Sequence, residues 1–288
     1  MIIREALVLG QKKLNASGIE SSNLDVSLLL AHVLNIEQTK LIAIYTDFLS
    51  EEKLTLFHKL LERRIEGECI AYILGKKEFW GIEFIVNSAV LVPRPDTEIL
   101  VEEVLKLLAA DNKNQEAENN IRVLDLCTGS GAIAIALKSS MPALTIWATD
   151  ICEKALEVAK KNAEKLLAPN TIQFFQGNLY EALPASNSRQ FDIITSNPPY
   201  ILSGKLKSLP PEVQKEPRLA LDGGIDGLDI IRKIIEDAPD YLKPGGKLFL
   251  EADPDQMNTI SLLLEKNGYS SIKKYKDLSG LERVICGH

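Results

Sequence analysis

From Ile121 to the C-terminus, short apolar runs of strand length alternate with longer amphipathic runs of helix length. Strands that are joined by helices and buried on both faces build a parallel sheet covered on each side. This part of the chain is therefore predicted to form an α/β domain with a doubly wound sheet. The first four expected strands cover 121–126, 145–150, 172–175 and 191–196, with helices over 132–138 and 152–167.

The pattern continues through the last hundred residues. A fifth strand is expected at 247–251, between a helix over 228–242 and another over 254–267. Two final runs, 271–276 and 282–286, are separated by a Ser-Gly pair and predict an antiparallel hairpin at the sheet edge. The polar segment 111–120 predicts a solvated loop.

The first 73 residues carry only helical signals. Apolar residues recur there at steps of three and four, and Ser50 followed by two glutamates is typical of a helix start. Aromatic and β-branched residues between 74 and 92 then indicate a β-hairpin linker. We therefore expect a small all-α N-terminal domain at 1–73, a linker at 74–92 and the α/β domain at 93–288.

Charge and composition narrow the classes of function. The net charge of −7 and pI near 5.2 lack the basic excess typical of proteins that clamp long nucleic acid. No apolar run approaches the roughly 20 residues that span a membrane, and the N-terminus does not resemble a signal peptide. The four cysteines are too scattered for a zinc site or a disulfide framework. A cytoplasmic protein that binds no metal and no membrane is expected.

A glycine-rich turn at 125–131 follows the first strand of the α/β domain. Ligands of open parallel sheets bind beyond the C-terminal strand ends, where the strand order reverses. Gly129 and Gly131 allow a tight turn, and the helix start behind them offers free N–H groups. Asp150 ends the next strand, where a carboxylate can accept hydrogen bonds from two ribose hydroxyls. These features predict a nucleoside cofactor.

The turn by itself leaves the cofactor open. Residues 129–134 also match the dinucleotide pattern G-x-G-x-x-[GA], and a tight turn without any ligand is the plainer alternative. Asp125 could either hold the loop or meet a positively charged ammonium group of the ligand. Because nicotinamide cofactors carry no such cation at that end, Asp125 favours S-adenosyl-L-methionine.

The loop Asn197-Pro198-Pro199-Tyr200, which we call the asparagine loop, follows the strand at 191–196 directly. It therefore reaches the same sheet edge as the glycine-rich turn. Consecutive prolines stiffen the backbone and remove two N–H donors. The loop therefore presents acceptors, namely the Asn197 side-chain oxygen and the Pro198 carbonyl. Tyr200 adds a flat face on which a planar group can stack.

Such a loop suits an amide or aromatic amine nitrogen, which is a poor nucleophile because its lone pair is delocalised. Two acceptors can bind its two N–H groups and stabilise the positive charge that grows on nitrogen. The sulfonium of S-adenosylmethionine carries an activated methyl group, so the remaining work is in-line positioning and requires no metal. Methyl transfer to a planar nitrogen is the hypothesis, and a plain connecting loop is the alternative.

These segments together resemble the HemK/PrmC family of protein-(glutamine N5) methyltransferases, which modify peptide chain release factors. The resemblance covers essentially the whole chain. It lies in Tyr72-Ile73-Leu74-Gly75, Glu78-Phe79-Trp80-Gly81, Val92-Pro93-Arg94-Pro95-Asp96-Thr97-Glu98, the turn at 124–131, Ser196 to Ile201, and Glu216-Pro217 with Ala220-Leu221 and Gly224 to Leu228.

The resemblance implies a Rossmann-like class I methyltransferase sheet and an N-terminal domain that helps to bind the release factor. It also implies methyl transfer to the glutamine of a Gly-Gly-Gln loop. The implied cofactor-binding residues are Cys127, Thr128, Gly129, Ser130, Gly131, Asp150, Asn178, Leu179 and Asn197. The implied catalytic and substrate-binding residues are Asn197, Pro198, Pro199 and Tyr200.

Two departures from the family pattern concern the site. Cys127 stands where a glycine is frequent, which a small side chain can tolerate. The segment 251–256 lacks the glycine that often follows this strand, which puts the local loop geometry in question.

Other functions share the asparagine loop. Adenine N6 methyltransferases of DNA and RNA face the same geometric problem after base flipping. A ribosomal protein is another candidate glutamine substrate, and a non-catalytic module that binds S-adenosylmethionine or NAD is a third alternative. The acidic charge and the helical N-terminal domain favour a protein substrate, without direct binding of nucleic acid. We expect a monomer.

Overall fold

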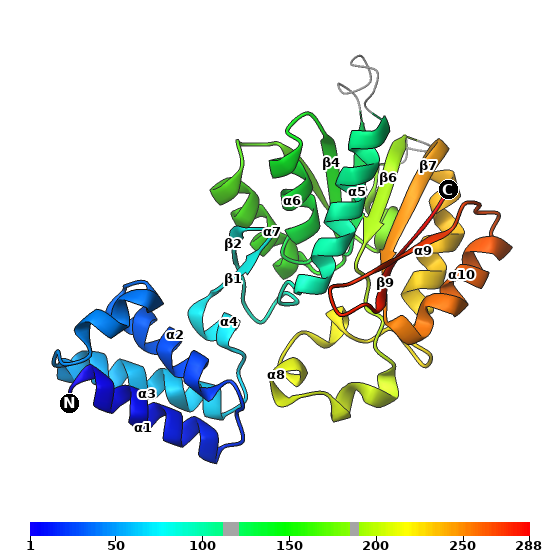
Figure 1. The fold of residues 1–288 in the computed structure, drawn as a ribbon. Helices are drawn as coiled ribbons and strands as arrows, with labels where there is room; N and C mark the ends of the chain where they lie inside the picture. Colours follow the sequence, from blue (N-terminus) through cyan, green and yellow to red (C-terminus); the bar gives the residue numbers. More distant parts are fainter. Residues whose placement is uncertain (112–120, 185–189) are drawn as a thin grey trace. The chain divides into compact units, whose positions relative to one another are not determined.

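The computed structural model describes residues 1–111, 121–184 and 190–288 (Figure 1). The chain divides into two compact units. The first comprises Met1–Lys76 with Pro210–Lys215, and the second comprises Lys77–Leu209 with Glu216–His288. Of the loop predicted at 111–120, Asp111 is the last residue of a helix, and the rest lies outside the described residues.

The first unit is helical. The Ser50 hydroxyl accepts a hydrogen bond from the Lys53 backbone at 3.3 Å, which confirms the predicted helix start. Phe57, Leu29 and Leu61 are fully buried in its core. The α-helices are α1 (Ile3–Ala16), α2 (Ser22–Leu34), α3 (Glu51–Ile65), α4 (Ile70–Leu74) and the short α8 (Pro211–Gln214), and a 3-10 helix spans Gln38–Ile44.

A buried ion pair holds this unit together. The Arg64 guanidinium lies 2.7 Å from the Asp25 carboxylate, and both side chains are about 95% buried. Glu212 of α8 lies 3.6 Å from the same guanidinium, so this short helix belongs to the electrostatic core of the helical unit. Breaking a buried pair by removing one partner typically costs about 3–5 kcal/mol.

The second unit contains a seven-stranded sheet within its described residues, in the order β5-β4-β3-β6-β7-β9-β8. Strands β3 to β7 are parallel, and β9 and β8 run antiparallel at one edge, as predicted. The strands are β3 (Arg122–Leu126), β4 (Thr145–Asp150), β5 (Ile172–Gln176), β6 (Phe191–Ser196), β7 (Leu242–Glu251), β8 (Lys273–Lys276) and β9 (Glu282–Gly287).

Helices cover both faces of this sheet (Figure 1). Because strand residues alternate in direction, Val123 of β3 packs into one core and Leu124 into the other. The first core contains α5 (Glu98–Asp111), α6 (Ala132–Ser140) and part of α7 (Glu153–Leu166). The second contains α9 (Asp229–Asp237) and α10 (Met257–Lys266). The predicted doubly wound sheet is confirmed.

A separate hairpin precedes the sheet, formed by β1 (Lys76–Phe79) and β2 (Ile82–Ile85). Its two turn residues, Trp80 and Gly81, both have positive φ, at 55° and 66°. Positive φ at both turn residues is typical of a two-residue hairpin turn, because its twist matches that of the flanking strands. The Trp80 N–H donates to the Glu98 carboxylate at 2.7 Å, which fixes the strained residue against α5.

One predicted boundary is wrong. The helix expected over 228–242 ends at Asp237, a 3-10 turn covers Ala238–Asp240, and β7 already begins at Leu242. Pro239 lacks the N–H that a continuing helix needs, so it ends the helix before the apolar pattern does.

Candidate active site

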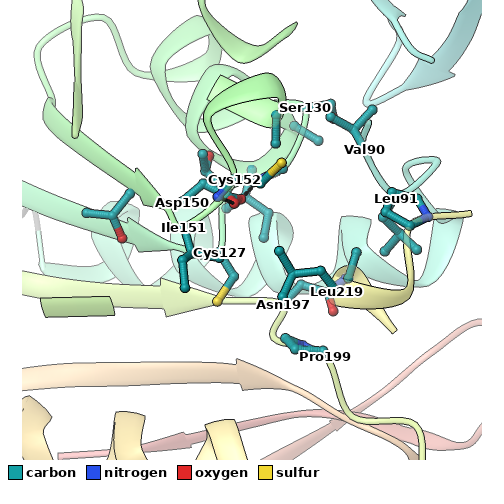
Figure 2. Close-up of a pocket in the computed structure, with 18 of the residues that line it drawn as sticks. Val90, Leu91, Cys127, Ser130, Asp150, Ile151, Cys152, Asn197, Pro199 and Leu219 are labelled. Atoms are coloured by element: carbon teal, nitrogen blue, oxygen red, sulfur yellow. Dashed lines mark hydrogen bonds between the residues drawn. The ribbon is translucent and has the colours of Figure 1, made fainter. Parts of the chain in front are cut away.

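A pocket of about 1090 Å³, its open mouth included, lies at the C-terminal ends of β3, β4 and β6. The register of these three strands explains where the pocket lies. Leu126 pairs with Thr149 in β4 and with Ser196 in β6, so the residues that follow all three strands emerge together. Figure 2 shows Cys127, Asp150 and Asn197 around this pocket.

The glycine-rich turn wraps one side of the pocket. The Gly129 N–H donates to one oxygen of Asp150 at 2.9 Å, and the Cys152 N–H donates to the other at 2.9 Å. Burial raises the pKa of Asp150. A carboxylate has about four acceptor sites, so Asp150 keeps acceptor capacity for a hydroxyl donor beside its backbone hydrogen bonds. Asp150 is thus oriented by the backbone and remains able to accept from a ribose.

Asp125 holds the glycine-rich turn through buried hydrogen bonds. It is fully buried, and it accepts hydrogen bonds from the hydroxyls of Thr128 at 2.6 Å and Thr195 at 2.9 Å. Burial raises the pKa of Asp125 to about 7, although these hydroxyls oppose the rise. Asp125 does not line the pocket.

Cys127 adopts the backbone that a glycine would favour. Its φ is 57°, and Gly129 and Gly131 follow with φ of 56° and 82°. A non-glycine residue in this region stores roughly 1–2 kcal/mol of strain. Cys127 lines the pocket, and burial raises the pKa of its thiol.

On the far side, Asn178 and Leu179 line the pocket after β5, and Leu179 also has a positive φ of 51°. The Asn178 side-chain nitrogen lies 3.4 Å from the Glu181 carboxylate, which leaves its oxygen as the free acceptor. A buried apolar side chain beside an amide acceptor suits a flat base with an amino group.

The asparagine loop closes the pocket opposite the turn. The Asn197 side-chain nitrogen donates to the Thr97 hydroxyl at 3.1 Å, across 100 residues of sequence. Thr97 ends the 3-10 helix Pro95–Thr97 and is itself buried. With its nitrogen engaged there, Asn197 retains its oxygen as an acceptor for a substrate N–H.

The C-terminal end of this loop is anchored through the backbone of Tyr200. The Gln256 side chain donates to the Tyr200 carbonyl at 2.9 Å, and Gly223 packs against Tyr200 so closely that an added Cβ would lie 2.7 Å from its Cα. The segment 251–256, whose geometry was in question, therefore supplies a clamp for the loop. The Tyr200 hydroxyl lies 3.4 Å from Glu251, at the end of β7.

Comparison with known proteins decides the family. The release factor glutamine methyltransferase of Geobacter sulfurreducens is 37% identical over 286 residues, which cover 99% of this chain and 96% of that protein. This chain belongs to the release factor glutamine methyltransferase family.

Other similarities agree with this family. Residues 5–75 match the PrmC N-terminal domain, and residues 101–209 match the Methyltransferase small domain. A bifunctional methyltransferase of Rickettsia felis is 38% identical over 304 residues, but the chain spans only 57% of that protein's length. The human Mettl16 catalytic domain, solved with an RNA hairpin, has a TM-score of 0.57 at 15% identity, covering 79% of this chain and 81% of that one, which shows a shared fold.

The pocket gathers most residues that the family resemblance implies. It is lined by Cys127, Thr128, Gly129, Ser130, Asp150, Asn178, Leu179, Asn197 and Pro199. Gly131, Pro198 and Tyr200 do not line it: Gly131 packs beneath the turn against Ile135 and Ala159, and Tyr200 packs against the second core. The roles of all these residues stay predictions.

Sequence reasoning missed a further group of lining residues. These are Val90, Leu91, Pro93, Arg94, Thr97, Thr149, Ile151, Cys152, Pro217, Leu219, Ala220 and Ile230, among others. Arg94 is paired with the buried Glu216, which also accepts from the Val92 N–H at 3.1 Å. The proline-flanked Arg94 and the Glu216-Pro217 pair were visible as family motifs, but only packing shows that they meet.

The residues present fit S-adenosylmethionine. A carboxylate prepared for a ribose, an amide acceptor beside an apolar side chain, and a glycine turn with room at Gly129 surround one pocket. No membrane-crossing helix, and no cluster of three or more metal-ligating side chains, occurs among residues 1–111, 121–184 and 190–288.

Proposed function

We propose that this chain transfers the methyl group of S-adenosylmethionine to the N5 amide nitrogen of the glutamine in the Gly-Gly-Gln loop of peptide chain release factors. The observation that carries the proposal is the Asn197 amide, whose nitrogen is bound to Thr97 and whose oxygen is left as an acceptor. Family membership supplies the substrate class.

Each residue has a definite task. The Asn197 oxygen and the Pro198 carbonyl accept the two N–H groups of the glutamine amide and turn its lone pair towards the methyl donor. Both acceptors also stabilise the positive charge that develops on nitrogen. Asp150 binds the ribose, while Asn178 and Leu179 bind the base. When bound, the cofactor supplies a methyl group on a positively charged sulfur.

The surrounding loop excludes water and orients the amide. Pro199 and Leu219 line the pocket with apolar surface. Tyr200 packs against the second core of the sheet and so supports the loop. A pocket that is largely apolar strengthens the two acceptor bonds on which the reaction depends.

The helical N-terminal domain at 1–73 recognises the release factor, and the linker at 74–92 joins it to the methyltransferase domain at 93–288. The protein works as a monomer in the cytoplasm, where translation factors are found. It binds no membrane and makes no direct contact with nucleic acid.

The test is transfer of labelled methyl from S-adenosylmethionine to a purified release factor. A release factor with glutamate in place of the Gly-Gly-Gln glutamine is the matched negative control, and a ribosomal protein and an adenine-containing oligonucleotide are tested beside it. Label in the intact release factor alone supports the proposal. Label in the oligonucleotide or the ribosomal protein, with none in the release factor, would overturn it.

A further inference from the structure

The asparagine loop is stiff but poor in hydrogen-bond donors. Pro198 and Pro199 have no N–H groups, so their backbone cannot be fixed through donors of its own. The beginning of the loop is fixed by the sheet, where Ser196 pairs with Leu250 of β7. The positions of Asn197 and of the Pro198 carbonyl therefore depend on what holds the other end of the loop.

Gln256 holds that other end. Its side-chain nitrogen donates to the Tyr200 carbonyl at 2.9 Å, and it lies 3.3 Å from the Gly227 carbonyl and 3.4 Å from the Asp226 carbonyl. Its side-chain oxygen accepts from the Asp253 N–H at 3.2 Å. Because one partner is a backbone donor and the others are backbone acceptors, these bonds allow the amide only one orientation. Gln256 is buried, so water competes little for them.

The turn around Gly227 closes over this contact. An added Cβ at Gly227, whose φ is 76°, would overlap both the Tyr200 carbonyl oxygen and the Gln256 side-chain nitrogen. Directly after the asparagine loop, the Ile201 carbonyl accepts from the Gly223 N–H at 2.8 Å. The loop and the turn are thus held together, and one side-chain amide lies at their junction.

We propose that Gln256 is a positioning residue for methyl transfer: by holding the Tyr200 carbonyl, it sets where Asn197 and the Pro198 carbonyl meet the substrate amide. The inference rests on the proposed function, because it assigns Gln256 to the same reaction. Gln256 does not line the pocket, so it acts through the asparagine loop and is not a catalytic residue. A misplacement of about 1 Å at the reacting groups can cost about 100-fold in rate, which sets the scale of the expected effect.

The first variant that tests this role is Gln256→Glu. It keeps the size of the side chain and the oxygen that accepts from Asp253, and it replaces the donor by an oxygen that the Tyr200 carbonyl repels. With release factor as substrate, kcat should fall about 10- to 100-fold. The KM for release factor and the dissociation constant of S-adenosylhomocysteine should change less than about threefold. Gln173→Glu, at an exposed position in β5, adds the same charge and should leave all three values unchanged.

A second variant and a second readout make the test independent of the added charge and of turnover. Gln256→Met removes the donor at nearly the same volume, and kcat should fall at least about fivefold. The Ile201 N–H donates to the Leu221 carbonyl at 2.9 Å and should exchange with solvent at least about tenfold faster in both variants. The Ile194 N–H, within β6, should exchange at the wild-type rate, because only the loop is loosened.

The outcomes separate this inference from the proposed function. Folded Gln256→Glu and Gln256→Met enzymes with wild-type kcat would overturn the positioning role, while the proposed function would stand. Equal losses of kcat and of S-adenosylhomocysteine affinity, with faster exchange at Ile194 as well, would also overturn it, since they indicate a general loss of structure. A wild-type enzyme that methylates no release factor would overturn the proposed function, and exchange at Ile201 would still decide whether Gln256 holds the loop.

Discussion

The side-chain nitrogen of Asn162, in α7, donates a buried 2.9 Å hydrogen bond to the Ser130 carbonyl in the glycine-rich turn. The same amide pairs with the backbone of Ile85 in β2, accepting from its N–H at 2.7 Å and donating to its carbonyl at 3.0 Å. One fully buried side chain thus joins the hairpin to the proposed cofactor turn.

Asn162→Ala should therefore loosen the turn. It leaves the buried Ser130 carbonyl and two half-buried backbone groups of Ile85 without their partner, and a buried group left unsatisfied costs about 1–3 kcal/mol. We expect a loss of stability of at least 2 kcal/mol by urea denaturation, and S-adenosylhomocysteine affinity lowered about tenfold by calorimetry. The exposed neighbour Lys161→Ala is the control. Equal affinities in the two variants would contradict the role of Asn162.

Asn197→Ala should nearly abolish turnover with little loss of cofactor affinity. It removes an acceptor that stabilises the developing charge, a type of loss that typically costs about 10²- to 10³-fold in kcat. Single-turnover methylation of release factor measures the chemical step, and titration with S-adenosylhomocysteine measures the affinity. Normal turnover in this variant would refute the mechanism.

Turnover should be lost as the pH falls through about 7. Burial raises the pKa of Glu251 to about 7, and nearby Asp96 adds to the rise, while Thr97, Arg283 and Tyr200 oppose it. Below that pH the carboxyl is protonated and is a weaker acceptor for the Tyr200 hydroxyl, which lies 3.4 Å from it, so the loop that carries Asn197 is held less firmly. The active form is the ionised one, and kcat should rise with pH to a plateau above about 8.

Glu251→Gln tests this assignment, because glutamine does not titrate. Its kcat should vary little between pH 6 and 8, while wild type shows the rising limb. Persistence of the same limb in the variant would assign it to another group, such as Asp125, whose pKa burial also raises to about 7.

Gly223→Ala should disturb the asparagine loop from outside the pocket. An added Cβ would lie 2.8 Å from the Pro199 carbonyl and 2.7 Å from the Tyr200 Cα, so the loop must shift. Overpacking of this kind costs about 1–3 kcal/mol. We expect a lower melting temperature together with a kcat reduced at least fivefold. Gly204→Ala, where an added Cβ meets nothing within 4 Å, should leave both unchanged.

The site was predictable from sequence where its residues follow strand ends. Cys127, Asp150 and Asn197 each come directly after an apolar run or close one, and parallel strands bring their C-terminal ends to one edge. Thr97, Asn162 and Glu216 could not be found in this way, because their partners lie far from them in the sequence.

The sequence by itself determined most of the strands and helices, the two apolar faces of the sheet and the residue types of the loop, because these depend on local periodicity and composition. Only the tertiary structure decided the strand order, the burial of Asp125 away from the pocket, and the contact between Asn197 and Thr97. The reason is physical. The partner of a half-buried amide such as Asn197 is a residue such as Thr97, which lies 100 positions away in the sequence, and packing alone brings the two together.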